Sequence, residues 1–206
     1  MTSLPSLISR KDHITNEILA TGEFYEADLL RYLRQRAHHG TCIDIGAYCG
    51  THSVAFSLAM PSTCVVAIES NPQAVEFLRT NAKLSPKITV VHAAIHDQWD
   101  GADIVPGPSH NSGMTQVREG KLIACHSLDA LSIEGASVLK IDVEGLELPV
   151  LRSAHKVLSQ RSLRDVVVEV SDATEIRVMQ WLAEYGFEQG RCFNSTPTYI
   201  YTRKPL

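Results

Sequence analysis

Short apolar runs that alternate with longer stretches of helical periodicity are the feature that most constrains the fold of this chain. Each run is rich in Val and Ile, and most end at an acidic residue or are followed closely by a glycine or proline. Such runs are typical of strands that are buried on both faces of a parallel sheet. We predict five of these strands, at residues 41–45, 64–69, 88–91, 138–142 and 166–170.

Helical stretches separate most of these runs. Helices are predicted at 50–60, 71–84, 146–158 and 174–185, and the second of them starts at Asn71-Pro72, a good cap and first-turn pair. Residues 24–36 predict one more helix, within a helical N-terminal lead-in over residues 1–40. Strands that alternate with helices imply an α/β fold, with a mostly parallel sheet and helices on both faces.

The C-terminal part of the chain has a different pattern. Residues 187–193 and 198–203 predict two strands whose connection is too short for a helical crossover, so they form an antiparallel hairpin and bring the sheet to seven strands. Residues 99–120 contain six glycines and prolines and predict a long loop, which we interpret as a lid that faces the substrate.

Length and charge limit the possible classes of protein. A chain of 206 residues fits a single domain, with a core over 41–206. The formal charge of -4, without any Lys- or Arg-rich run, predicts that nucleic acid is not a partner. Dispersed cysteines and the lack of a long apolar stretch or leader pattern predict a cytoplasmic protein that does not enter a membrane.

Two features predict a ligand site at the carboxyl edge of the sheet. Gly46, in the segment Asp44-Ile45-Gly46-Ala47-Tyr48-Cys49-Gly50 at the end of the first strand, allows a sharp turn and close approach to a ligand. Glu69 ends the second strand, where a carboxylate can accept hydrogen bonds from ribose hydroxyls. Taken singly, the glycines could be turn punctuation and Glu69 a solvated strand end. Their combination favours an adenosine-containing cofactor.

With these segments the sequence resembles the FkbM-type S-adenosylmethionine-dependent methyltransferases. The resemblance implies a Rossmann-like class I methyltransferase fold, with S-adenosylmethionine as cofactor and S-adenosylhomocysteine as product. Two positions depart from the family's pattern, because Tyr48 stands where Asn is common and Ser70 where Pro is common. The matching segments are 44–47 with Gly50, 66–69 with 71–72, 127–129, and Lys-Ile-Asp-Val-Glu-Gly over 140–145 followed by Glu147 and Leu151.

The resemblance also implies where the cofactor binds. Ala94 is expected near the adenine, at the end of the third strand. Asp44 is expected to contact the cofactor, although it could equally hydrogen-bond only the amides that follow it. The complete set of expected cofactor-binding residues is Asp44, Gly46, Ala47, Tyr48, Glu69, Ser70, Ala94 and Asp142.

The best candidates for chemistry are Asp142 and Glu144, where the fourth strand meets its helix. The pair could remove a proton from the acceptor, or hold a divalent cation that lowers the pKa of a hydroxyl. Alternatively, Asp142 binds the amino group of the cofactor and Glu144 only caps the helix. His52 and His110 are further candidate bases, and Tyr25 with Glu26 is expected to close over the cofactor.

The predicted activity is O-methylation of a small-molecule hydroxyl, on a sugar or a secondary metabolite, as the resemblance implies. N-methylation stays open, but no Asn-Pro-Pro-Tyr-like segment for a flipped DNA base is present. A non-catalytic nucleotide-binding module of the same fold is an alternative. An NAD-dependent oxidoreductase is a weaker one, because Gly46 and Gly50 do not give the G-x-G-x-x-G spacing.

Overall fold

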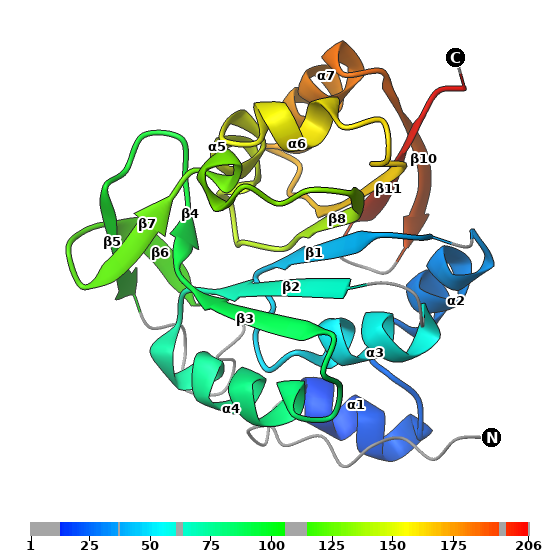
Figure 1. The fold of residues 1–206 in the computed structure, drawn as a ribbon, viewed down its shortest axis with the longest axis vertical. Helices are drawn as coiled ribbons and strands as arrows, with labels where there is room; N and C mark the ends of the chain where they lie inside the picture. The colour runs from blue at the N-terminus through cyan, green and yellow to red at the C-terminus, as the bar shows by residue number, and fades with distance from the viewer. Residues whose placement is uncertain (1–12, 37, 61–63, 106–114, 194–196, 206) are drawn as a thin grey trace.

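A computed structural model describes residues 13–36, 38–60, 64–105, 115–193 and 197–205. Its centre is a seven-stranded sheet, and a smaller four-stranded sheet adjoins one end of it (Figure 1). The large sheet has the order β10-β11-β9-β8-β1-β2-β3. Its strands are β1 (Thr41–Ile45), β2 (Cys64–Glu69), β3 (Ile88–His92), β8 (Ala136–Ile141), β9 (Asp165–Glu169), β10 (Phe187–Phe193) and β11 (Thr198–Arg203).

The strand directions confirm the predicted sheet. Strands β3, β2, β1, β8 and β9 are parallel, whereas β11 is antiparallel to both β9 and β10. The hairpin strands have the predicted bounds. They are antiparallel because a connection of four residues cannot hold a crossover helix. All six residues of β8 are buried, which explains why its sequence is a continuous apolar run rather than an alternating one.

Helices cover both faces of the large sheet, as predicted, with α5 to α7 on one side and α2 to α4 on the other (Figure 1). Alternate strand residues point to opposite faces. Leu139 packs in the cluster that includes Leu151 and Val178, whereas Val138 packs with Leu29 and Phe56. The helices are α1 (His13–Thr21), α2 (Ala27–Gln35), α3 (Thr51–Ala59), α4 (Pro72–Ala82), α5 (Glu147–Arg152), α6 (His155–Ser159) and α7 (Glu175–Glu184).

Two predicted helices differ from the observed ones. The single helix expected over 146–158 is divided into α5 and α6, because the Ser153 carbonyl accepts the Asp129 N–H and the Asp129 carboxylate accepts the Lys156 N–H. The helix expected over 24–36 begins only at Ala27, since Glu26 has a left-handed φ of 55°.

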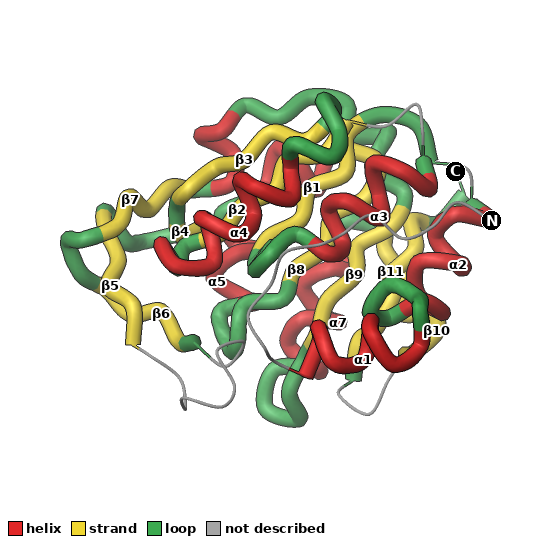
Figure 2. The backbone as a smooth tube through the Cα atoms, turned by 90° about the horizontal axis from the view of Figure 1, so that it is seen from below, coloured by secondary structure: helices red, strands yellow, loops and turns green. Residues whose placement is uncertain are grey.

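The prediction of a long loop over 99–120 was wrong. Strands β5 (Gly101–Val105) and β6 (Gln116–Glu119) form an antiparallel pair there. With β7 (Ile123–His126) and β4 (Ala94–Ile95) they make the small sheet, in the order β4-β7-β5-β6 (Figure 2). A small apolar cluster of Ala94, Ala102, Ile123 and Cys125 stabilises it. Residues 106–114, and with them His110, lie outside the described residues.

None of the helices in the described part of the chain is long and apolar enough to cross a membrane.

Candidate functional site

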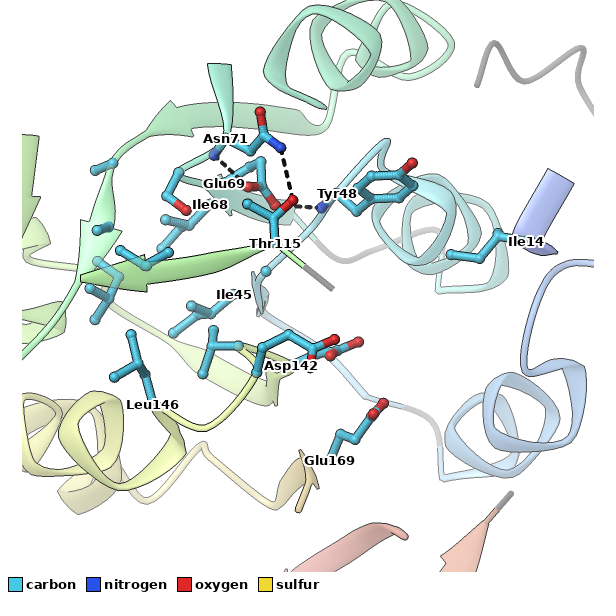
Figure 3. A pocket seen from close by; sticks show the side chains of 18 of the residues that line it. Ile14, Ile45, Tyr48, Ile68, Glu69, Asn71, Thr115, Asp142, Leu146 and Glu169 are labelled. Carbon is cyan, nitrogen blue, oxygen red and sulfur yellow. Dashed lines mark hydrogen bonds between the residues drawn. The ribbon is translucent and has the colours of Figure 1, made fainter. Parts of the chain in front are cut away.

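A cavity of about 370 Å³ opens at the carboxyl edge of the large sheet. Residues at the ends of β1, β2, β8 and β9 line it, together with Ala94 and Ile95 of β4 and Ile14 of α1 (Figure 3). The volume lies in the range that holds one small-molecule ligand. The predicted site residues that line the cavity are Gly46, Tyr48, Glu69, Ser70, Ala94, Asp142 and Glu144.

The turn after β1 fits only a glycine at its first position. Gly46 has a φ of 77°, and a Cβ atom added there would lie 1.7 Å from the carbonyl oxygen of Asp142. Hydrogen bonds fix this turn to the end of β2, because the N–H groups of Gly46 and Ala47 both donate to the Ile68 carbonyl, each at 3.0 Å. The turns after β1 and β8 are therefore in direct backbone contact beneath the cavity.

Backbone donors hold the Glu69 carboxylate in place. The Tyr48 N–H donates to Oε2 at 2.8 Å, and the Asn71 N–H donates to Oε1 at 2.6 Å. Burial raises the pKa of Glu69, although these N–H groups oppose the shift. A carboxylate has about four acceptor positions, so the oxygens can still accept two ribose hydroxyls. The fit to an adenosine is thus good at this end of the cavity.

Asp142 forms an ion pair with a buried lysine. The Nζ of Lys140 lies 2.9 Å from Oδ2 of Asp142, with side-chain exposures of 3% and 31% respectively. Burial alone would lower the pKa of Lys140, but the carboxylates of Asp142, Asp44 and Glu26 outweigh burial and raise it above its usual value. Lys140 therefore stays charged and holds the Asp142 carboxylate at the cavity.

Glu144 lies in a turn with left-handed backbone. Its φ is 51° and that of Gly145 is 99°, and the Gly145 N–H donates to Oε1 of Glu147 at 2.6 Å. Burial raises the pKa of Glu144, and the nearby charges of Asp142 and Glu147 raise it further. Glu147 was matched only as part of the resemblance, and the structure shows that it stabilises the turn that carries Glu144.

Glu169 is a site residue that the sequence analysis missed. It ends β9 and lines the cavity, on the side opposite Glu69 and Asn71 (Figure 3). Burial raises its pKa to about 8, with further contributions from Asp142, Glu26 and Glu144. A signal was present in the sequence, because Glu169 is the one acidic residue within the fifth apolar run and lies next to its last residue, much as Glu69 ends the second run.

Three predicted site residues do not line the cavity. Asp44 is fully buried and accepts the Ser53 hydroxyl at 2.5 Å, and Ala47 is also buried. His52 Nε2 lies 2.9 Å from Oε2 of Glu26. Its ring meets the Tyr25 ring edge-on, with centroids 6.1 Å apart.

Tyr25 and Glu26 were predicted to close over the cofactor together, but the structure places only Tyr25 at the cavity. Tyr25 lines the cavity, and burial, with the Glu26 charge, raises its pKa to about 12. Glu26 instead pairs with His52 behind the cavity wall. Within the described residues, no group of three or more His, Cys, Asp or Glu side chains is arranged to hold a metal ion.

Comparison with solved structures identifies the fold. The chain superposes on an FkbM methyltransferase of Methylobacillus flagellatus with a TM-score of 0.60 and 17% identity, over 80% of this chain and 43% of that one. For a precorrin-6y C5,15-methyltransferase of Geobacter metallireducens the TM-score is 0.59 with 18% identity, over 99% and 94% of the two chains. The fold is that of the class I methyltransferases.

Sequence comparison gives the family. Residues 44–188 match the Methyltransferase FkbM domain, so the chain belongs to the FkbM methyltransferase family. It is also 29% identical, over 153 residues, to a hexuronic acid methyltransferase of Haloferax volcanii. The match covers 70% of this chain and 62% of that relative.

Proposed function

We propose that this chain transfers a methyl group from S-adenosylmethionine to a hydroxyl group of a small molecule. The observation that carries the proposal is the Glu69 carboxylate, held by two backbone N–H groups beside the Gly46 turn at the edge of a cavity of about 370 Å³. This arrangement suits a ribose hydroxyl pair and a backbone that must approach a ligand closely. Membership of the FkbM family supports the same cofactor.

Each end of the cavity has a distinct proposed role. Glu69 and Tyr48 hold the ribose, and the apolar side chains of Ala94 and Ile95 lie against the adenine. Asp142, fixed by Lys140, orients the amino acid part of the cofactor. The cofactor supplies an electrophilic methyl group on a sulfonium, and the chain contributes alignment and proton removal.

Asp142 and Glu144 remain our candidates for the catalytic pair, as cavity-lining carboxyls. For Glu144, a raised pKa suits a group that accepts a proton near neutral pH. His52 has no surface in the cavity, so we assign it to holding the Tyr25–Glu26 segment rather than to proton transfer.

A sugar is the acceptor we favour. The name of the Haloferax relative specifies a hexuronic acid, and this chain spans 62% of that protein. The fold does not by itself define the acceptor, because a candidate RNA methyltransferase of Pyrococcus horikoshii shares it, with a TM-score of 0.52 and 13% identity. The formal charge of -4 favours a small molecule over RNA.

Calorimetric titration with S-adenosylmethionine, and with NAD for comparison, tests the cofactor. We expect binding of the first only. Glu69→Ala should weaken binding by about 1–3 kcal/mol, which is the scale of charge-assisted hydrogen bonds. Glu76→Ala is the matched control, because the Glu76 side chain is 77% exposed on α4. An unchanged dissociation constant for a folded Glu69→Ala variant would mean that the cofactor binds elsewhere.

A further inference from the structure

One end of the cavity concentrates negative charge. Asp142, Glu144 and Glu169 all line it where β8 and β9 end, and Figure 3 shows the Asp142 and Glu169 side chains on the same side of the cavity. No lysine, arginine or histidine occurs among the described residues that line the cavity. An uncharged ligand would leave these carboxyls facing one another across a partly buried space.

The nearby basic side chains already contact other carboxylates. Lys140 pairs with Asp142 at 2.9 Å, and His52 lies 2.9 Å from Glu26. Within the described residues, no basic nitrogen lies within 4.0 Å of the Glu169 carboxylate. Carboxyls that share a partly buried space cannot all be ionised without cost, so burial and the neighbouring charges favour a proton on one of them.

Glu169 is the member of this group that most favours a proton. Its pKa is raised to about 8, first by burial and then by the surrounding charges. Lys140 opposes the shift without cancelling it. The titratable and charged groups that act on Glu169 from the neighbouring segments are Lys140, Asp142, Glu144, Glu26 and Tyr25.

The strand order indicates that the positively charged part of the proposed cofactor lies toward this end of the cavity. Strands β2, β1, β8 and β9 are successive neighbours. Neighbouring strands lie about 4.8 Å apart, so the ends that carry Glu69 and Glu169 are roughly 14 Å apart. If Glu69 holds the ribose, the sulfonium, which is one carbon away from the ribose, is nearer to β8 and β9 than the adenine is.

We propose that Glu169 senses the charge of the cofactor: it holds a proton in the ligand-free protein and releases that proton when the sulfonium of S-adenosylmethionine binds. The inference rests on the proposed cofactor. S-adenosylhomocysteine has an uncharged sulfur at the same place and leaves the proton on Glu169. Glu169 is thus a specificity residue that favours the methyl donor over the product.

Proton release can be measured without knowledge of the acceptor. Calorimetric titrations at pH 7 in phosphate and in Tris, which differ in ionisation enthalpy, give the number of protons released on binding. We expect S-adenosylmethionine to release about half a proton or more from the wild type, relative to Glu169→Gln. The amino group of the cofactor titrates equally in both proteins, so the difference isolates Glu169. With S-adenosylhomocysteine the difference should be close to zero.

Affinity gives an independent readout. Between pH 6 and pH 8 the wild type should bind S-adenosylmethionine more tightly as pH rises, by up to about tenfold per unit relative to Glu169→Gln. Glu76→Gln, on the exposed face of α4, should behave as the wild type. Equal proton release and equal pH dependence in wild type and Glu169→Gln would overturn the inference, whereas failure of the wild type to bind the cofactor would overturn the proposed function instead.

A titration of the wild type alone covers the case in which Glu169→Gln fails to fold. Carbon-13 NMR of glutamate-labelled protein should show one carboxyl that titrates well above the ordinary glutamate range and moves to lower pH when S-adenosylmethionine, but not S-adenosylhomocysteine, is added. If every glutamate carboxyl titrates in the ordinary range, Glu169 carries no proton at neutral pH and the inference fails.

Discussion

Among the described residues, three that are not glycine adopt left-handed backbone around the cavity. Glu26, Tyr48 and Glu144 have φ values of 55°, 49° and 51°. Such conformations cost free energy and persist where the surrounding structure fixes them, often at functional sites. Here each residue lies at a turn that shapes or supports the cavity wall. Two of the three, Tyr48 and Glu144, line the cavity directly.

The strain at Tyr48 can be measured by substitution. Asparagine tolerates left-handed backbone, whereas a β-branched residue does not. We expect Tyr48→Asn to be at least as stable as the wild type and Tyr48→Val to be less stable, by about 1–2 kcal/mol. Urea denaturation gives both values. Equal stabilities for the two variants would show that the backbone of this turn relaxes freely.

Gly46 should tolerate no side chain at all. Its added Cβ would meet the carbonyl oxygen of Asp142, a backbone atom that cannot rotate away. We expect Gly46→Ala to lose about 3 kcal/mol or more of unfolding free energy, or to displace the turn and abolish cofactor binding. Gly186→Ala is the control, because its φ of 79° is also left-handed but its Cβ would meet no atom within 4 Å. A similar loss in both variants would assign the effect to φ alone.

At the scale of elements, a buried carboxylate connects the segment after α2 to the sheet. Arg36 Nε lies 2.7 Å from Oδ2 of Asp165, His38 Nε2 lies 2.9 Å from the same atom, and the Thr202 hydroxyl donates to Oδ1 at 2.7 Å. Burial alone would raise the pKa of Asp165, but these hydrogen bonds outweigh it and lower the pKa. The network therefore stabilises the protein above the ordinary aspartate pKa and is lost as pH falls through the lowered value.

Removal of this carboxylate should be costly, because it takes away the negative charge that faces both Arg36 and the buried His38. We expect Asp165→Ala to lose about 3 kcal/mol or more, in guanidinium denaturation at pH 7. Asp28→Ala breaks an exposed ion pair with Arg31, and it should have no measurable effect. If the two variants lost equal stability, the network would contribute no more than a surface contact.

At the scale of the whole molecule, the charged end of the cavity should reduce stability in alkaline solution. The pKa of Glu169 is raised to about 8 from an ordinary value of 4.5, so the native state holds a proton that the unfolded chain has lost. Stability must then fall as pH rises between these values. Glu169→Gln removes this dependence. We expect it to be more stable than the wild type by roughly 1–3 kcal/mol at pH 8.5 and no different at pH 4.5.

This trade-off is measured by urea denaturation of both proteins, without ligand, across that pH range. A constant difference in unfolding free energy would show that Glu169 titrates normally. A difference that grows with pH and is reduced by added S-adenosylmethionine would agree with the proposal that Glu169 releases its proton when the sulfonium binds.

The sequence by itself determined the large sheet. Five apolar runs and a four-residue connection were enough to predict seven strands and the antiparallel hairpin, because strands buried on both faces leave a strong local pattern. The same rule placed Glu69 and Asp142 at the ligand edge, since carboxyl ends of parallel strands meet there. These predictions needed only local pattern and chain direction.

Tertiary structure alone decided the rest. The glycines and prolines of 99–120 predicted a loop, yet β5 and β6 pair there because apolar residues from β4 and β7, which lie outside that segment, complete their small core. His52 was expected at the site, but it pairs with Glu26 from the lead-in segment and does not line the cavity. The raised pKa of Glu169 depends on carboxylates from other elements, because electrostatic interactions follow distance in space and not order along the chain.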